Sequence, residues 1–102
     1  MIIFEREHNP TLILWEAYKD GRLAENYHLH DMAQNITRVI AVLRVNKAYR
    51  VDEYCMGDTG DGMHTHRLFF KGDVVAYGFS DDGMWALAFD HYLRLATKDM
   101  QI

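Results

Sequence analysis

Residues 64–79 read HTHRLFFKGDVVAYGF, and this stretch decides the predicted fold. Two apolar runs, His64–Phe70 and Val74–Phe79, lie on either side of the dipeptide Gly72-Asp73. A glycine at the first central position suits a type II′ turn, whose twist matches that of two antiparallel strands. The stretch therefore predicts a β-hairpin with its turn at Gly72-Asp73.

A helix is predicted directly after this hairpin. Ser80 is a favourable N-cap residue, and Asp81 and Asp82 place negative charge at the positive end of the helix dipole. Further along, apolar residues recur with the period of one helix face. They are Trp85, Ala88, Phe89, Tyr92, Leu93 and Ala96. The pattern indicates an amphipathic helix whose apolar stripe, including Trp85, faces the core.

The first half of the chain shows a similar order of signals. Asp20-Gly21 separates Thr11–Tyr18 from Arg22–Leu29, and Asp-Gly between apolar runs is typical of a type I′ hairpin turn. Asp31 then suits a helix N-cap, with Gln34 as its capping-box partner. The helical spacing that follows is carried by Met32, Ile36, Val39, Ile40 and Leu43. We therefore expect a second hairpin followed by a second helix.

The two hairpin–helix units are similar to each other. Tyr18-Lys19-Asp20-Gly21 aligns with Phe70-Lys71-Gly72-Asp73, and a short extended segment precedes each unit, Ile2–Glu7 and Tyr49–Met56. Either a duplication or two unrelated units of similar design account for this. The expected architecture is α+β, a single domain over residues 1–102 with the order βββα-βββα. It has an antiparallel sheet of about six strands with two helices packed on one face.

Composition narrows the class of protein. The 102 residues are 49% hydrophobic and 25% charged, which suits one globular domain rather than a disordered chain. No apolar run approaches the ~18 residues of a membrane span. The early charges of Glu5, Arg6 and Glu7 argue against a secretory signal, and a lone cysteine, Cys55, excludes an internal disulfide. We therefore expect a cytoplasmic protein that does not bind membranes.

Histidine is enriched, with six in the chain. Four of them form two His-x-His pairs, His28 with His30 and His64 with His66. On a strand, residues i and i+2 point to the same side, so each pair presents two imidazoles to zinc or another divalent metal. The apolar alternation of the two predicted strands instead places the pairs on opposite faces, where they cannot meet and are solvated or hydrogen-bonded. A metal site is therefore the alternative hypothesis, and a protein without a cofactor is the leading one.

No set of residues for catalysis stands out. Cys55 lies alone, as small buried cysteines do, and helix capping explains Ser80. The loop Gly57-Asp58-Thr59-Gly60-Asp61-Gly62 lacks the lysine of a phosphate-binding loop and the closing glutamate of an EF-hand. These residues therefore favour a binding protein over an enzyme, and the histidine pairs leave a small metalloenzyme as the alternative.

Charge is distributed unevenly along a chain of net charge −4. Residues 32–51 contain four cations and no acid, whereas residues 52–90 contain eight acids and two cations. The cations are expected to stabilise the C-terminal end of their own helix, so direct binding to nucleic acid is not expected. The acidic half suits a basic surface of a partner. The expected contact residues are Asp58, Asp61, Asp73, Asp81 and Asp82, together with the aromatic side chain of Trp15.

These features favour a small, acidic, non-catalytic protein-binding module. Its partner would be another protein, and the acidic half suits an inhibitor or modulator of a larger nucleic-acid-handling protein, such as a phage-encoded antagonist of host machinery. The alternative is a metal-binding protein or small metalloenzyme that uses His28, His30, His64 and His66. Homodimerisation through a sheet edge is compatible with either hypothesis.

Overall fold

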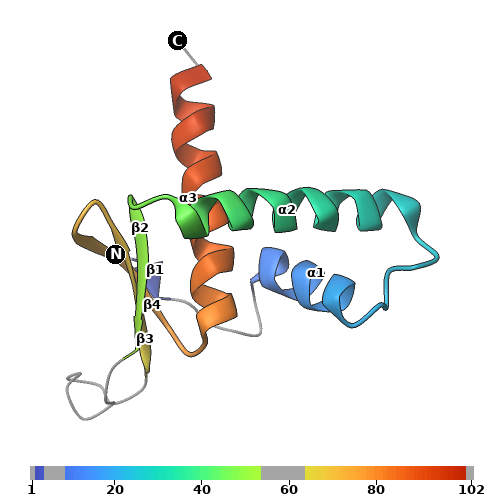
Figure 1. Ribbon diagram of the computed structural model, residues 1–102, viewed down its shortest axis with the longest axis horizontal. Coiled ribbons are helices and arrows are strands. Elements are labelled where there is room, and N and C mark those ends of the chain that lie inside the picture. The colour runs from blue at the N-terminus through green and yellow to red at the C-terminus, as the bar shows by residue number, and fades with distance from the viewer. Residues whose placement is uncertain (1, 4–8, 54–63, 101–102) are drawn as a thin grey trace.

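The computed structural model describes residues 2–3, 9–53 and 64–100. Its elements run in the order β1 (Ile2–Ile3), α1 (Pro10–Lys19), α2 (Tyr27–Val45), β2 (Tyr49–Glu53), β3 (His66–Phe70), β4 (Asp73–Gly78) and α3 (Asp81–Met100). The sheet, α3 and the pair formed by α1 and α2 are three successive layers (Figure 1). Helix α3 is the middle layer, because it contacts β2, β3 and β4 as well as both other helices. Within these ranges, none of the helices has the length and apolar character that a membrane span requires.

The predicted hairpin of the second half is confirmed, with a different turn. Strands β3 and β4 pair antiparallel, and the pairing of Phe70 with Asp73 leaves Lys71 and Gly72 as the two turn residues. Both have positive φ, 50° for Lys71 and 90° for Gly72. That combination defines a type I′ turn rather than the expected type II′ turn, in which only the first central residue has positive φ.

The hairpin predicted for the first half is wrong, because Thr11–Tyr18 lies within helix α1. The Asn9 side chain caps this helix by accepting a hydrogen bond from the Leu12 N–H at 3.0 Å. Pro10 occupies the first helical turn, where its missing N–H costs nothing. Leu12 and Trp15, three residues apart, are both buried, so the apolar run follows a helical period.

Asp20-Gly21 ends helix α1 instead of forming a hairpin turn. The Gly21 N–H donates to the Tyr18 carbonyl, and the Arg22 N–H donates to the Ala17 carbonyl at 2.9 Å. This pair of bonds is the Schellman motif, which places its C′ residue in the left-handed region. Gly21 has a φ of 74°, which a glycine adopts without steric cost. The same dipeptide therefore satisfies two different turns, and here the preceding helix decides between them.

Helix α2 begins earlier than predicted. Its N-cap is Asn26, whose side chain accepts from the Leu29 N–H at 3.1 Å, and not Asp31. His28, His30 and Asp31 consequently lie inside the helix. The predicted apolar stripe is largely confirmed, because Ile36, Ile40 and Leu43 are buried; Val39 is partly buried and Met32 is exposed.

The predicted fold class is wrong in the number and placement of its elements. The described residues form three helices and a sheet of order β1-β4-β3-β2, in which β2, β3 and β4 are antiparallel and the two-residue β1 pairs parallel with β4. The expected six strands and two helices are therefore absent from the described ranges. The βββα-βββα repeat is wrong as well, because the first half contains α1 where the second half contains the hairpin. Instead of two helices on one face, α3 covers the sheet while α1 packs on the other helices.

The core is built around the first half of α3. The Ser80 hydroxyl accepts from the Gly83 N–H at 2.9 Å, which confirms the predicted cap. All six residues from Met84 to Phe89 are buried, although they span more than one full helical turn. A helix that is buried on all sides lies between two packed layers, here the sheet and the other helices.

Candidate functional site

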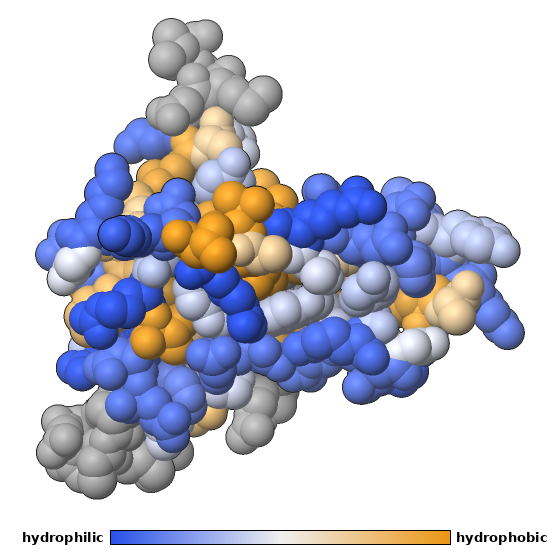
Figure 2. Space-filling view, viewed as in Figure 1, coloured by the Kyte–Doolittle hydropathy of each residue, from blue (hydrophilic) through white to orange (hydrophobic). Residues whose placement is uncertain are grey.

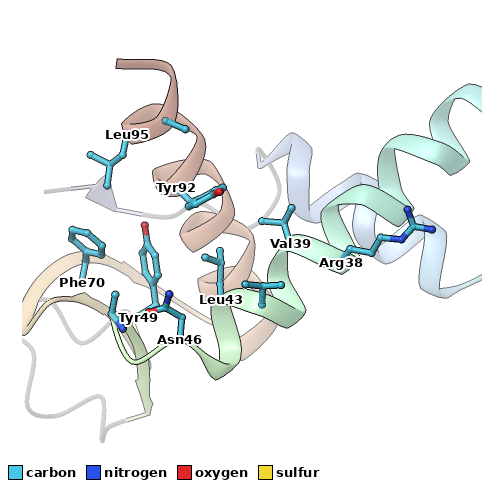
Figure 3. Close-up of a pocket in the computed structure, with 11 residues that line it drawn as sticks. Arg38, Val39, Leu43, Asn46, Tyr49, Phe70, Tyr92 and Leu95 are labelled. Atoms are coloured by element: carbon cyan, nitrogen blue, oxygen red, sulfur yellow. Dashed lines mark hydrogen bonds between the residues drawn. The ribbon is translucent and has the colours of Figure 1, made fainter. Parts of the chain in front are cut away.

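An apolar groove of about 650 Å³ lies between α2, α3 and the end of the sheet (Figure 3). Helices α2 and α3 supply opposite walls, and the starts of β2 and of the β3–β4 turn supply the floor. The lining residues are Arg38, Val39, Val42, Leu43, Asn46, Ala48, Tyr49, Phe70, Tyr92, Leu95 and Ala96.

The groove forms because helix α3 is longer than the layers on its two sides. Its last turns project beyond the sheet and beyond α2 (Figure 1). Apolar side chains on the two walls consequently face solvent: Val42 is 61% exposed, Tyr92 43% and Leu95 39%. Where α2 crosses α3, apolar residues gather on the surface between hydrophilic ones (Figure 2). The groove is therefore open along its length rather than enclosed.

The floor of the groove is a packed aromatic cluster. The Tyr49 hydroxyl and His91 Nδ1 form a hydrogen bond of 2.6 Å, and the Phe70 ring lies 4.9 Å from the Tyr49 ring and 4.7 Å from the His91 ring, between centroids. Burial raises the pKa of Tyr49 to about 12, and the nearby Tyr92 adds to this effect. Burial also lowers the pKa of His91, and Arg94 lowers it further. Both groups are therefore uncharged at neutral pH, so this cluster adds no charge to the floor of the groove.

Cations surround the groove. Arg38 is a lining residue, and in Figure 3 it extends from α2 at the end away from Phe70. Lys47 lies between the lining residues Asn46 and Ala48, and the Lys71 Nζ lies 5.3 Å from the Phe70 ring centroid. None of the lining residues, nor any residue directly next to one in sequence, is acidic. The groove is therefore positively charged at its rim, although the chain as a whole carries −4.

The acidic residues predicted to contact a partner lie elsewhere. Asp81 and Asp82 are in the first turn of α3, where the Asp82 carboxylate accepts from Lys19 Nζ at 2.6 Å. The Arg44 guanidinium is 3.8 Å from each of the two carboxylates. These acids therefore link the start of α3 to α1 and α2, which leaves less of their charge for a partner.

Of the remaining positions that the sequence singled out, two are described by the structure and three lie outside the described residues. Asp73 is exposed beside the β3–β4 turn, free to meet a partner. Trp15 is 5% exposed and lies under the Lys19 ammonium, 4.0 Å from its ring centroid, so it offers a partner little surface. Outside the described residues are Cys55, Asp58 and Asp61.

The two histidine pairs do not share the geometry predicted for them. His28 and His30 are in the first turn of a helix, where residues i and i+2 diverge by roughly 200° around the axis. His66 begins β3, and His64 is buried against Tyr77 with ring centroids 4.8 Å apart. Across the described parts of the chain, no group of three or more His, Cys, Asp or Glu side chains is arranged to hold a metal ion.

The sequence prediction missed the groove, although one signal of it is visible. Helix α2 carries apolar residues at Val42 and Val45, outside the stripe that faces the core, and both are exposed. Helix α3 carries Tyr92, Leu93 and Leu95, which is more apolar surface than one helix face holds. Comparison with family models, with curated proteins and with solved structures found no match for this chain.

Proposed function

We propose that the chain is a non-catalytic protein-binding module that uses the groove between α2 and α3 as its docking surface. The observation that carries the proposal is the exposure of Val42, Tyr92 and Leu95 along one continuous apolar groove. Soluble monomers rarely expose contiguous apolar surface without a use for it, and such surfaces are typical of protein interaction sites.

The proposed contact surface is the apolar groove, whereas the sequence predicts an acidic surface. The narrower hypothesis, an inhibitor of a nucleic-acid-handling protein, depends on an acidic face that is free to bind a basic partner. Asp81 and Asp82 are instead engaged with Lys19 and Arg44 of the same chain. We therefore base the proposal on the apolar groove.

Site-specific photo-crosslinking tests the location of the docking surface. A crosslinking amino acid at Val42 lies in the groove, whereas the same residue at Ala41 is exposed on the same helix and does not line it. We expect a discrete adduct with one protein from position 42 in the native cell, and none from position 41.

The affinity of the captured partner is then measured with purified proteins, and it should depend on the groove. We expect Val42→Arg to weaken the complex at least about tenfold, because it places a charge in an apolar contact, and Ala41→Arg to leave it unchanged. Both positions are exposed, so circular dichroism should show an unaltered fold. Equal adducts from both positions, or full affinity in Val42→Arg, would refute the docking site.

A further inference from the structure

We propose that the occupant of the groove is an amphipathic helix of another protein, with acidic residues flanking its apolar face. The inference rests on the proposed function and names the chemistry of the partner. Its two supports are the shape of the groove and the sign of the charge around it.

The shape suits a helix. The α2 wall contributes lining residues from Arg38 to Asn46, which span about 12 Å at the rise of an α-helix. The α3 wall contributes Tyr92, Leu95 and Ala96 at helical spacing. Two helical walls above an apolar floor are the geometry into which an amphipathic helix inserts side chains at i, i+3 or i+4, and i+7. An acyl chain would require enclosure that an open groove does not supply.

The positive charge at the rim of the groove favours a partner helix with acidic residues. Arg38, Lys47 and Lys71 stand at the rim, and none of them forms a salt bridge with another described residue. Asp73, across the turn from Phe70, is the acid on that hairpin tip. Acidic side chains on a partner helix would pair with the rim cations and set its orientation.

The rim charge disfavours a second copy of this chain, and the buried rings disfavour nucleic acid. In a symmetric dimer through this groove, each copy would bring its own Arg38 and Lys47 to the rim of the other, and like charges would meet. Single-stranded nucleic acid stacks on exposed aromatic rings. Here Tyr49 is buried and Lys71 lies over the Phe70 ring, so among the lining residues Tyr92 alone presents an open aromatic ring, and successive bases would lack a stacking platform.

Binding to designed peptides tests this inference without knowledge of the natural partner. The probe is a fluorescent amphipathic peptide of about 14 residues, or roughly four turns, with leucines at i, i+4 and i+7 and flanking glutamates. Its matched control has lysine at every glutamate position. We expect the acidic peptide to bind at least about threefold more tightly, the size expected of two exposed ion pairs. Added salt should weaken its binding, and its methyl contacts in NMR spectra should map to Val42 and Leu95.

Charge reversal on the chain supplies the second arm. Arg38→Glu with Lys47→Glu should abolish the preference for the acidic peptide. Arg22→Glu with Arg50→Glu changes the net charge equally at exposed positions outside the groove lining and should preserve it. Equal affinity for both peptides, or contacts outside the groove, would overturn the inference.

Three further results would also overturn it. They are binding of an oligonucleotide or of anionic vesicles in the groove in place of the acidic peptide, a chain mass that doubles with concentration through the groove, and no binding of either peptide. In each case the crosslinking result at Val42 decides separately whether the groove docks a protein.

Discussion

The cap of helix α1 gives the sharpest test of the fold, because the sequence alone predicts a strand there. The Asn9 side chain is buried, 6% exposed, and accepts the Leu12 N–H at 3.0 Å. Asn26 makes the equivalent bond to the Leu29 N–H at 3.1 Å, but in an exposed position. The two residues therefore have the same capping role, but Asn9 is shielded from water and also hydrogen-bonds the Asp90 carboxylate.

The structure predicts unequal costs for the two alanine variants. Loss of an N-cap costs ~1 kcal/mol on average. At position 26, water can replace the lost oxygen, so we expect Asn26→Ala to cost about 0.5–1 kcal/mol. At position 9 the Leu12 N–H would be buried without a partner, which adds ~1–3 kcal/mol. We therefore expect Asn9→Ala to lower the free energy of unfolding by about 2–4 kcal/mol, or Tm by roughly 10 °C or more.

Urea denaturation of both variants measures this difference, with equal slopes as the check that both unfold cooperatively. Asn9→Ser is the matched control, because serine also caps a helix and should retain most of the stability. If Asn9→Ala and Asn26→Ala cost the same, or if Asn9→Ser is as unstable as Asn9→Ala, the capping role of Asn9 is wrong. Retention of full stability in Asn9→Ala would favour the strand predicted from sequence over helix α1.

Three further predictions concern the core and the pH dependence of stability. Leu68 is fully buried in the central strand β3, so Leu68→Ala should cost about 2–5 kcal/mol in urea denaturation, whereas Val42→Ala, at an exposed position, should stay within about 0.5 kcal/mol. Burial raises the pKa of Asp90 above its usual 3.8, so its contribution to stability is full below that pH and is lost as the pH rises through the higher folded value. Asp90→Asn should therefore be more stable than the native chain at pH 7 and not at pH 3, by thermal melts at both. Burial lowers the pKa of His91 below 6.5, so its contribution is present above that pH and is lost as the pH falls through the lower folded value. His91→Gln should flatten this part of the stability profile between pH 7 and pH 5; an unchanged slope would contradict the assignment.

The second half of the chain could be predicted because its signals agree with each other. Gly72 lies between two runs rich in valine and phenylalanine, and Ser80 with two aspartates opens a long periodic stretch. The hairpin and α3 are therefore in place, but the turn lies at Lys71-Gly72 instead of Gly72-Asp73 and is of a different type. That difference arises because Lys71 adopts a positive φ, which the residue type alone disfavours.

The first half was predicted wrongly because its signals are ambiguous. The run Leu12-Ile13-Leu14-Trp15 is short and apolar, and such a run fits a strand or a buried helix equally. Asp20-Gly21 supplies the positive φ that both a hairpin turn and a Schellman motif require. The deciding signal was Asn9-Pro10, an N-cap residue followed by proline, which is a helix start.

The groove could not be predicted from sequence, because its position depends on where α2 crosses α3. Residues more than 40 positions apart, such as Tyr49 and Tyr92, meet there. Local patterns describe which face of a helix is apolar, and they do not state how far one helix extends past another. The charge pattern was visible, since residues 32–51 carry four cations and no acid. From sequence these cations are expected to stabilise the C-terminal end of their own helix. In the structure Arg38 lines the groove, and Lys47 lies between two lining residues.

Helix α3 connects the stability of the fold with the proposed docking. Its first half, Met84 to Phe89, is enclosed by the sheet and the other helices and forms the centre of the core. Its second half projects from the body and keeps apolar residues at Tyr92 and Leu95, where polar ones would reduce the exposed apolar surface. Folding alone does not require those side chains, because they are exposed in the folded chain. The proposed partner would cover the groove and supply the burial that explains these side chains, and the rim cations are the reason to expect acidic residues on it.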